Sequence, residues 1–127
     1  MDPTVRAALD RGGVIDITTT GRRSGKPRRI EIFLHNVDGR PVISGMPARE
    51  RTRAWIHNLE ADTRLTVHLK QGLSADLPAT ARIVTDEEER RALLVHVARN
   101  WNRTDVEEMV AWSPLIEVTI PGYAAAA

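Results

Sequence analysis

Thr18-Thr-Thr-Gly-Arg-Arg-Ser-Gly-Lys-Pro-Arg-Arg29 is the stretch around which the rest of the chain is organised. Apolar and polar residues alternate on both sides of it, over residues 14–20 and 28–37, and a period of two is typical of β-strands. Within the stretch, Gly21 and Gly25 permit backbone angles that other residues rarely adopt. It is therefore predicted to be the turn that joins two neighbouring strands.

This turn is strongly basic. Five cations lie within eight residues, with no acid between Ile17 and Ile30: Arg22, Arg23, Lys26, Arg28 and Arg29. Backbone amides, hydroxyl groups and a dense positive field at one turn favour the binding of phosphate or carboxylate groups. A solvated basic hairpin loop without a ligand is the alternative that the residues alone leave open.

The composition limits the classes of protein to consider. A chain of 127 residues is expected to form a single domain, residues 1–127. The net charge of +1 argues against a general nucleic-acid binder, although residues 22–29 and 49–53 hold eight of the eighteen cations. The absence of cysteine excludes disulfides, thiolate chemistry and cysteine–zinc sites. No apolar run approaches the ~20 residues of a membrane span, and no signal peptide is recognised, so a cytoplasmic location is expected.

The pattern of the whole chain predicts a mainly β domain with packed helices, a small six-stranded antiparallel barrel. Asp38-Gly39 is a strong hairpin signal, and Thr85 with Glu88 forms a capping-box pattern at a helix start. Strands are expected over residues 14–20, 28–37, 40–45, 64–70, 77–85 and 115–120, and helices over residues 3–10, 51–61, 85–101 and 104–112.

The basic turn resembles the signature of the deazaflavin-dependent nitroreductase family, the actinobacterial reductases that use coenzyme F420. Other segments match this family in the same order: Val37-Asp38-Gly39 before a strand that ends in Ser44-Gly45, the helix segment Ala54-Trp55-Ile56-His57-Asn58-Leu59, and Thr85-Asp86-Glu87-Glu88-Glu89-Arg90. The similarity covers roughly residues 14–122. It implies a split β-barrel of the FMN-binding split-barrel type, with a cofactor groove beside the barrel.

The resemblance also implies a set of cofactor-binding residues for coenzyme F420 (8-hydroxy-5-deazaflavin). Met46-Pro47 stands where many members carry Ser-Lys, so Arg49 or Arg53 is the candidate replacement for that lysine. The implied residues are Arg22, Arg23, Ser24, Gly25, Lys26, Pro27 and Arg28 in the turn, Ser44, Gly45 and Met46 at the end of a strand, and Arg49, Arg53, Ala54 and Trp55 at the start of a helix.

The same resemblance suggests hydride transfer from reduced F420 to a small electron-poor acceptor, such as a quinone, enone, lactone or nitroaromatic. Phe33 occupies the position of a family tyrosine, and Trp101 and Trp112 lie where the nitroreductase branch has further tyrosines. These three aromatic residues are therefore the predicted substrate-binding residues. A cofactor that carries the reactive chemistry explains why the sequence offers no catalytic dyad.

Several alternatives remain open at this stage. An FMN-dependent split-barrel oxidoreductase would share the fold, although FMN needs fewer cations than a coenzyme with an oligoglutamate tail. A deazaflavin carrier without turnover fits the same residues, whereas a nucleic-acid-binding β-barrel would be expected to interleave aromatics with its arginines. His35 and His68 are expected on outward strand faces, and neither their spacing nor that of His57 and His96 predicts a metal site. The oligomeric state stays open.

Overall fold

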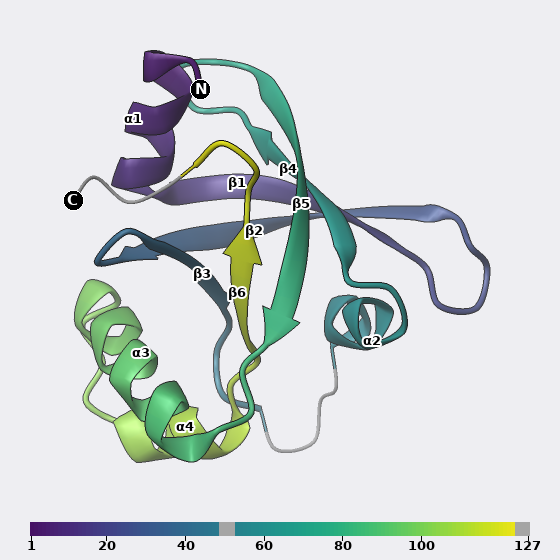
Figure 1. Ribbon diagram of the computed structural model, residues 1–127. Helices are drawn as coiled ribbons and strands as arrows, with labels where there is room; N and C mark the ends of the chain where they lie inside the picture. Colours follow the sequence, from purple (N-terminus) through teal and green to yellow (C-terminus); the bar gives the residue numbers. More distant parts are fainter. Residues whose placement is uncertain (49–52, 124–127) are drawn as a thin grey trace.

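Six strands form the body of the molecule in a computed structural model that describes residues 1–48 and 53–123. They are β1 (Gly13–Thr20), β2 (Pro27–Val37), β3 (Arg40–Ser44), β4 (Arg64–Leu69), β5 (Ala75–Ile83) and β6 (Leu115–Thr119). All neighbouring strands are antiparallel and close into a barrel in the order β1-β2-β3-β6-β5-β4 (Figure 1). The predicted six-stranded antiparallel barrel is confirmed.

The alternating pattern of the strands produces the barrel interior. In β1, Ile15 and Ile17 are buried while Asp16 between them points outward, and β4 buries Leu65 and Val67 in the same way. Burial of each such side chain contributes roughly 1.5–3 kcal/mol to the stability of the fold. A shift of the register by one residue would move these side chains to the outer face, so their burial fixes the register of the strands.

Four helices accompany the barrel in the described part of the chain: α1 (Pro3–Arg11), α2 (Ala54–Ala61), α3 (Glu87–Asn100) and α4 (Val106–Trp112). Leu9 of α1 and Trp55 and Leu59 of α2 join the barrel core, so these two helices pack against it at different places (Figure 1). None of these helices is both long and apolar enough to cross a membrane.

The N-terminus of α3 differs by one residue from the expected capping box. Asp86, rather than Thr85, is the N-cap, and its carboxylate accepts a hydrogen bond from the Glu89 amide at 2.9 Å. A carboxylate both satisfies this free N–H group and interacts favourably with the positive end of the helix dipole. The helix therefore begins at Glu87 and not at residue 85.

Helices α3 and α4 form a second core outside the barrel, where Leu94 and Val97 of α3 pack with Met109 of α4 and Val42 of β3. This layer covers part of the outer face of β2, so His35, on the outward face where it was expected, is nevertheless buried and only 1% exposed. His68 is also buried, and its two ring nitrogens contact Thr18 and Asp76 on the adjacent strands.

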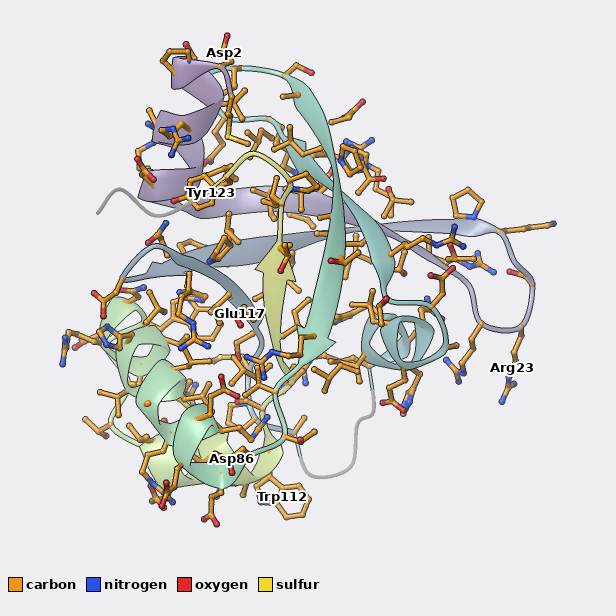
Figure 2. All side chains as sticks on the ribbon, in the orientation of Figure 1. Asp2, Arg23, Asp86, Trp112, Glu117 and Tyr123 are labelled. Atoms are coloured by element: carbon orange, nitrogen blue, oxygen red, sulfur yellow. The ribbon has the colours of Figure 1, made fainter. Side chains whose placement is uncertain are left out.

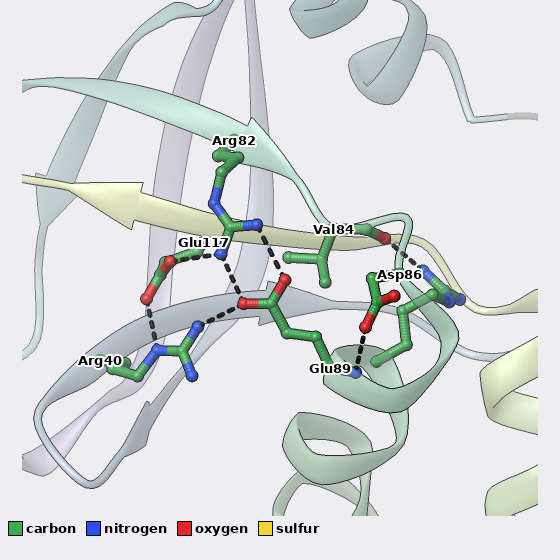
Figure 3. Close-up of polar contacts among 7 residues, drawn as sticks. Arg40, Arg82, Val84, Asp86, Glu89 and Glu117 are labelled. Carbon is green, nitrogen blue, oxygen red and sulfur yellow. Dashed lines mark hydrogen bonds and ion pairs between the residues drawn. The ribbon is translucent and has the colours of Figure 1, made fainter.

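A cluster of two arginines and two glutamates connects α3 to the barrel wall (Figure 3). Glu89 of α3 accepts from Arg82 of β5 at 2.7 Å and from Arg40 of β3 at 2.9 Å, and both arginines also contact Glu117 of β6. Arg82, and to a smaller extent Arg40, lowers the pKa of Glu89 to about 2. The cluster therefore stays ionised throughout the neutral range.

Candidate functional site

The basic turn between β1 and β2 is held in shape by hydrogen bonds between its own residues. The Gly21 amide donates to the Lys26 carbonyl at 2.8 Å, and the Gly25 amide donates to the Gly21 carbonyl at the same distance. Gly25 has a φ of +69°, a conformation that glycine adopts without steric cost. The exposed side chains of the turn, Arg23 among them, project away from the barrel (Figure 2).

A pocket of about 500 Å³ lies between this turn and α2. Seven of the predicted cofactor-binding residues line it together: Arg22, Arg23, Ser24, Pro27, Arg28, Ala54 and Trp55. They come from two segments of the sequence that are about thirty residues apart. The fold thus brings the basic turn and the tryptophan-containing helix to one site.

Five further residues line the pocket and were not among the predicted ones: Thr19, Gly21, Arg29, Ile30 and Asn58. Gly21, Thr19 and Arg29 belong to the basic stretch, and Asn58 to the helix segment that carried the family resemblance. Asn58 and Thr19 are 4% and 2% exposed, so they form the buried floor of the pocket. The sequence did contain a signal for Asn58, because this polar residue lies on the same face of the helix as the buried apolar residues Trp55 and Leu59.

The cations of the pocket differ in whether an acid neutralises them. Within the described part of the chain, Arg22, Arg23 and Arg28 form no ion pair with an acidic side chain, whereas Arg29 pairs with Asp16 at 2.9 Å. Hydrogen bonds from Lys70 and then from Arg29 lower the pKa of Asp16, which keeps this carboxylate charged. The positive charge of the first three arginines therefore remains available to an anionic ligand.

Ser44, Gly45, Met46 and Arg53 form a second group of predicted residues, at the end of β3. The Ser44 hydroxyl donates to the Pro114 carbonyl at 2.7 Å, and Arg53 donates to the Met46 carbonyl at 2.6 Å. The Arg53 guanidinium lies so close to Gly45 that a Cβ on this glycine would be 3.1–3.2 Å from it. The absence of a side chain at position 45 thus leaves space for the Arg53 guanidinium.

The remaining predicted cofactor residues lie elsewhere. Lys26 is exposed in the turn, and Gly25 borders a second groove of about 610 Å³ beside the turn, which also includes Thr18, Thr66 and Pro78. Arg49 lies outside the described residues.

The predicted substrate residues divide into a cluster and an isolated side chain. Phe33 and Trp101 lie in edge contact, with ring centres 6.2 Å apart, and His35 contacts both rings at 4.8 Å. Trp112 of α4 is 42% exposed (Figure 2). Among the described residues that line the pocket beside the turn, none of these three aromatics occurs.

His35 has an unusual environment within this aromatic cluster. Its Nδ1 lies 3.1 Å from the Asn100 amide nitrogen, and its Nε2 is buried without a hydrogen-bond partner among the described residues. Burial lowers the pKa of His35 to about 4, so the imidazole is neutral near pH 7. It therefore packs as a neutral ring rather than as a charge.

The closed six-stranded antiparallel barrel is the fold of the flavin and deazaflavin split barrels. The chain belongs to the F420H(2)-dependent quinone reductase family, whose model matches residues 2–120. It is accordingly an oxidoreductase that depends on coenzyme F420, with a small-molecule acceptor. The family predicted from the basic turn and the tryptophan-containing helix is confirmed.

Solved structures support the same fold. An F420-H2 dependent reductase, FDR-A, is similar with a TM-score of 0.63 and 20% identity, over 84% of this chain and 94% of that one. A conserved hypothetical protein from Mycobacterium tuberculosis gives a TM-score of 0.71 with 18% identity, over 95% and 81%. A NimC/NimA family protein from Clostridium acetobutylicum gives 0.63 with 15% identity, over 94% and 84%. At these identities the likeness concerns the fold alone.

Proposed function

We propose that this F420-dependent reductase binds the anionic part of its cofactor in the pocket beside the basic turn, and that it reduces flat electron-poor acceptors such as quinones, enones or lactones. The observation that carries the proposal is the set of three arginines that line the pocket without an acidic partner among the described residues. F420 has one phosphodiester and several carboxylates, and such a ligand matches a pocket rich in guanidinium groups.

The residues of the pocket fit this cofactor by their chemistry. Arg22, Arg23 and Arg28 would hold its phosphate and carboxylate groups, while the Ser24 hydroxyl adds a neutral donor. When bound, F420 supplies the hydride. The guanidinium groups would stabilise negative charge on the bound molecule, and the apolar side chains of Trp55 and Ile30 would exclude water from the pocket.

The described lining of the pocket beside the turn contains arginines, hydroxyls, an amide and apolar groups, but no carboxylate and no imidazole. It therefore matches an anion by charge and contains no acidic side chain that would repel one. Phe33, Trp101 and Trp112 remain the proposed acceptor-binding residues, because flat apolar acceptors gain from stacking and from burial of area against aromatic rings.

An acceptor panel with reduced F420 tests the proposal directly. Planar quinones, enones and lactones should be reduced faster than bicyclic nitroimidazoles, as measured by the loss of reduced F420 in steady-state kinetics. A clear preference for the nitroimidazoles would contradict the proposed acceptor class.

Substitution of the aromatic residues tests the acceptor site. Phe33→Ala or Trp101→Ala should raise the acceptor KM with little change in the affinity for F420, because the rings would contact the acceptor and not the cofactor. The melting temperature of each variant must be measured in parallel, since both rings also pack on His35. A lower melting temperature with an unchanged KM would make the cluster purely structural.

A further inference from the structure

Asn58 is the buried polar side chain that connects α2 to the basic turn. Its Oδ1 accepts a hydrogen bond from the Arg22 backbone N–H at 3.1 Å, and its Nδ2 donates to the Thr19 hydroxyl oxygen at 3.1 Å. Asn58 is 4% exposed and Thr19 is 2% exposed. Both ends of one amide are therefore used, one on the strand before the turn and one on the turn itself.

The other hydrogen bonds of the turn serve a different purpose. The bonds of Gly21 with Lys26, of Gly25 with Gly21 and of Lys26 with Ser24 lie within the turn, so they fix its shape but not its position. The bond from Arg22 to Asn58 instead crosses from the turn to α2. Since α2 also supplies Ala54 and Trp55 to the pocket, this contact connects the turn to the helix that lines the pocket with it.

We propose that Asn58 is a positioning residue for the cofactor site, which holds Arg22 and its neighbouring cations at the correct place relative to α2. The identity of the anionic ligand rests on the function proposed above, whereas the placement of the turn by Asn58 does not. A buried amide suits this role because its NH2 group donates while its oxygen accepts a hydrogen bond. It is also uncharged, so it would not repel an anionic ligand.

Three substitutions separate the contributions of this amide. Asn58→Ala removes both hydrogen bonds and leaves the Arg22 N–H and the Thr19 hydroxyl without these partners. Asn58→Asp keeps an acceptor for the Arg22 N–H, and the Thr19 hydroxyl can rotate to donate to the new carboxylate. Glu60→Ala, on the exposed side of the same helix, is the control for changes in α2 that do not involve the pocket.

Amide hydrogen exchange of the cofactor-free protein tests the placement of the turn. The Arg22 amide should exchange at least roughly tenfold faster in Asn58→Ala than in the parent, and it should stay protected in Asn58→Asp and Glu60→Ala. Val67 in the barrel reports on global stability in the same samples. Equal exchange of Arg22 in parent and Asn58→Ala, or a common acceleration of Arg22 and Val67, would overturn the inference.

Fluorescence titration with F420 tests the consequence for binding. Asn58→Ala should weaken the affinity roughly tenfold, because the cations of the turn are no longer held in place relative to α2, and Glu60→Ala should leave the affinity unchanged. Unchanged affinity in Asn58→Ala, or the same weakening in Glu60→Ala, would overturn the role in cofactor binding. If the parent itself does not bind F420, the proposed function fails, while the exchange result still decides the placement of the turn.

Discussion

Arg23 and Arg28 combine exposure, positive charge and the absence of an acidic partner among the described residues. Arg82, by contrast, is engaged by Glu89 and Glu117 and would have to leave them to bind a ligand. An arginine without such a partner loses no ion pair when an anion binds, so its full interaction contributes to affinity.

Replacement of Arg23 or Arg28 by Ala should therefore weaken F420 binding and leave the fold intact. The loss of one charged hydrogen bond corresponds to about 1.5–3 kcal/mol, roughly ten- to a hundred-fold in Kd. The effect should be smaller with a coenzyme that lacks its glutamate tail. Arg11→Ala, in α1, is the matched control. If both pocket variants bind the complete coenzyme as tightly as the parent, the anionic groups bind elsewhere.

His35 makes the stability of the fold dependent on pH. Its pKa is about 4 in the folded protein, because of burial, against an ordinary value of 6.5. As the pH falls below 6.5, His35 is protonated in the unfolded chain, whereas in the folded chain it stays neutral until about pH 4. The free energy of unfolding therefore decreases as the pH falls through this range. Above pH 6.5 both states are neutral at this residue and no dependence arises from it.

Urea unfolding at pH 7 and at pH 4.5 measures this contribution. The parent should lose about 2–3 kcal/mol more than His35→Gln between these two pH values. The comparison with the variant is needed because ion-paired carboxylates such as Glu89 titrate in both proteins. A loss of the same size in parent and variant would show that His35 does not titrate with a lowered pKa.

At the scale of the elements, Arg90 of α3 fixes the end of α4. Its guanidinium donates to the carbonyls of Val84 at 2.9 Å, Val110 at 2.9 Å and Ser113 at 2.7 Å. The last carbonyls of a helix have no partner within the helix, so a cation at this place satisfies them and also suits the helix dipole. Arg90 thus links α3 to the C-terminal end of α4.

Arg90→Ala should lower the free energy of unfolding by about 2–4 kcal/mol, because several buried carbonyls lose a charged donor. Arg91→Ala is the matched control on the same helix, since its exposed pairs with Glu87 and Glu107 are screened by solvent and should matter much less. Urea denaturation of the two variants decides between them. Equal effects of the two substitutions would contradict the capping role of Arg90.

At the scale of the whole molecule, the strands could be predicted because alternation is a local property. The segments around Ile15, Ile32 and Val67 show it clearly, and each is a strand. The closure of the barrel through β1 and β4, and the insertion of β6 between β3 and β5, could not be derived from local patterns. They depend on contacts between residues that are far apart in the sequence.

The site was predictable to the extent that its chemistry is concentrated in one stretch. The cations of the turn were evident, but Asn58 was not assigned a role, because its partners Thr19 and Arg22 become neighbours only when α2 packs on the barrel. The burial of His35 was missed for a similar reason, since the covering helix α3 begins about fifty residues later. Alternation identifies the two faces of a strand but not what covers the outer one.

In the proposed function, the basic turn binds an anionic cofactor. The most direct test is a titration with F420 and with FMN at low and high salt, roughly 50 mM and roughly 500 mM. We expect micromolar or tighter binding of F420, much weaker binding of FMN, and an F420 affinity that falls as salt rises, because exposed charge contacts are screened. Equal affinity for FMN, or F420 binding that is insensitive to salt, would contradict the account.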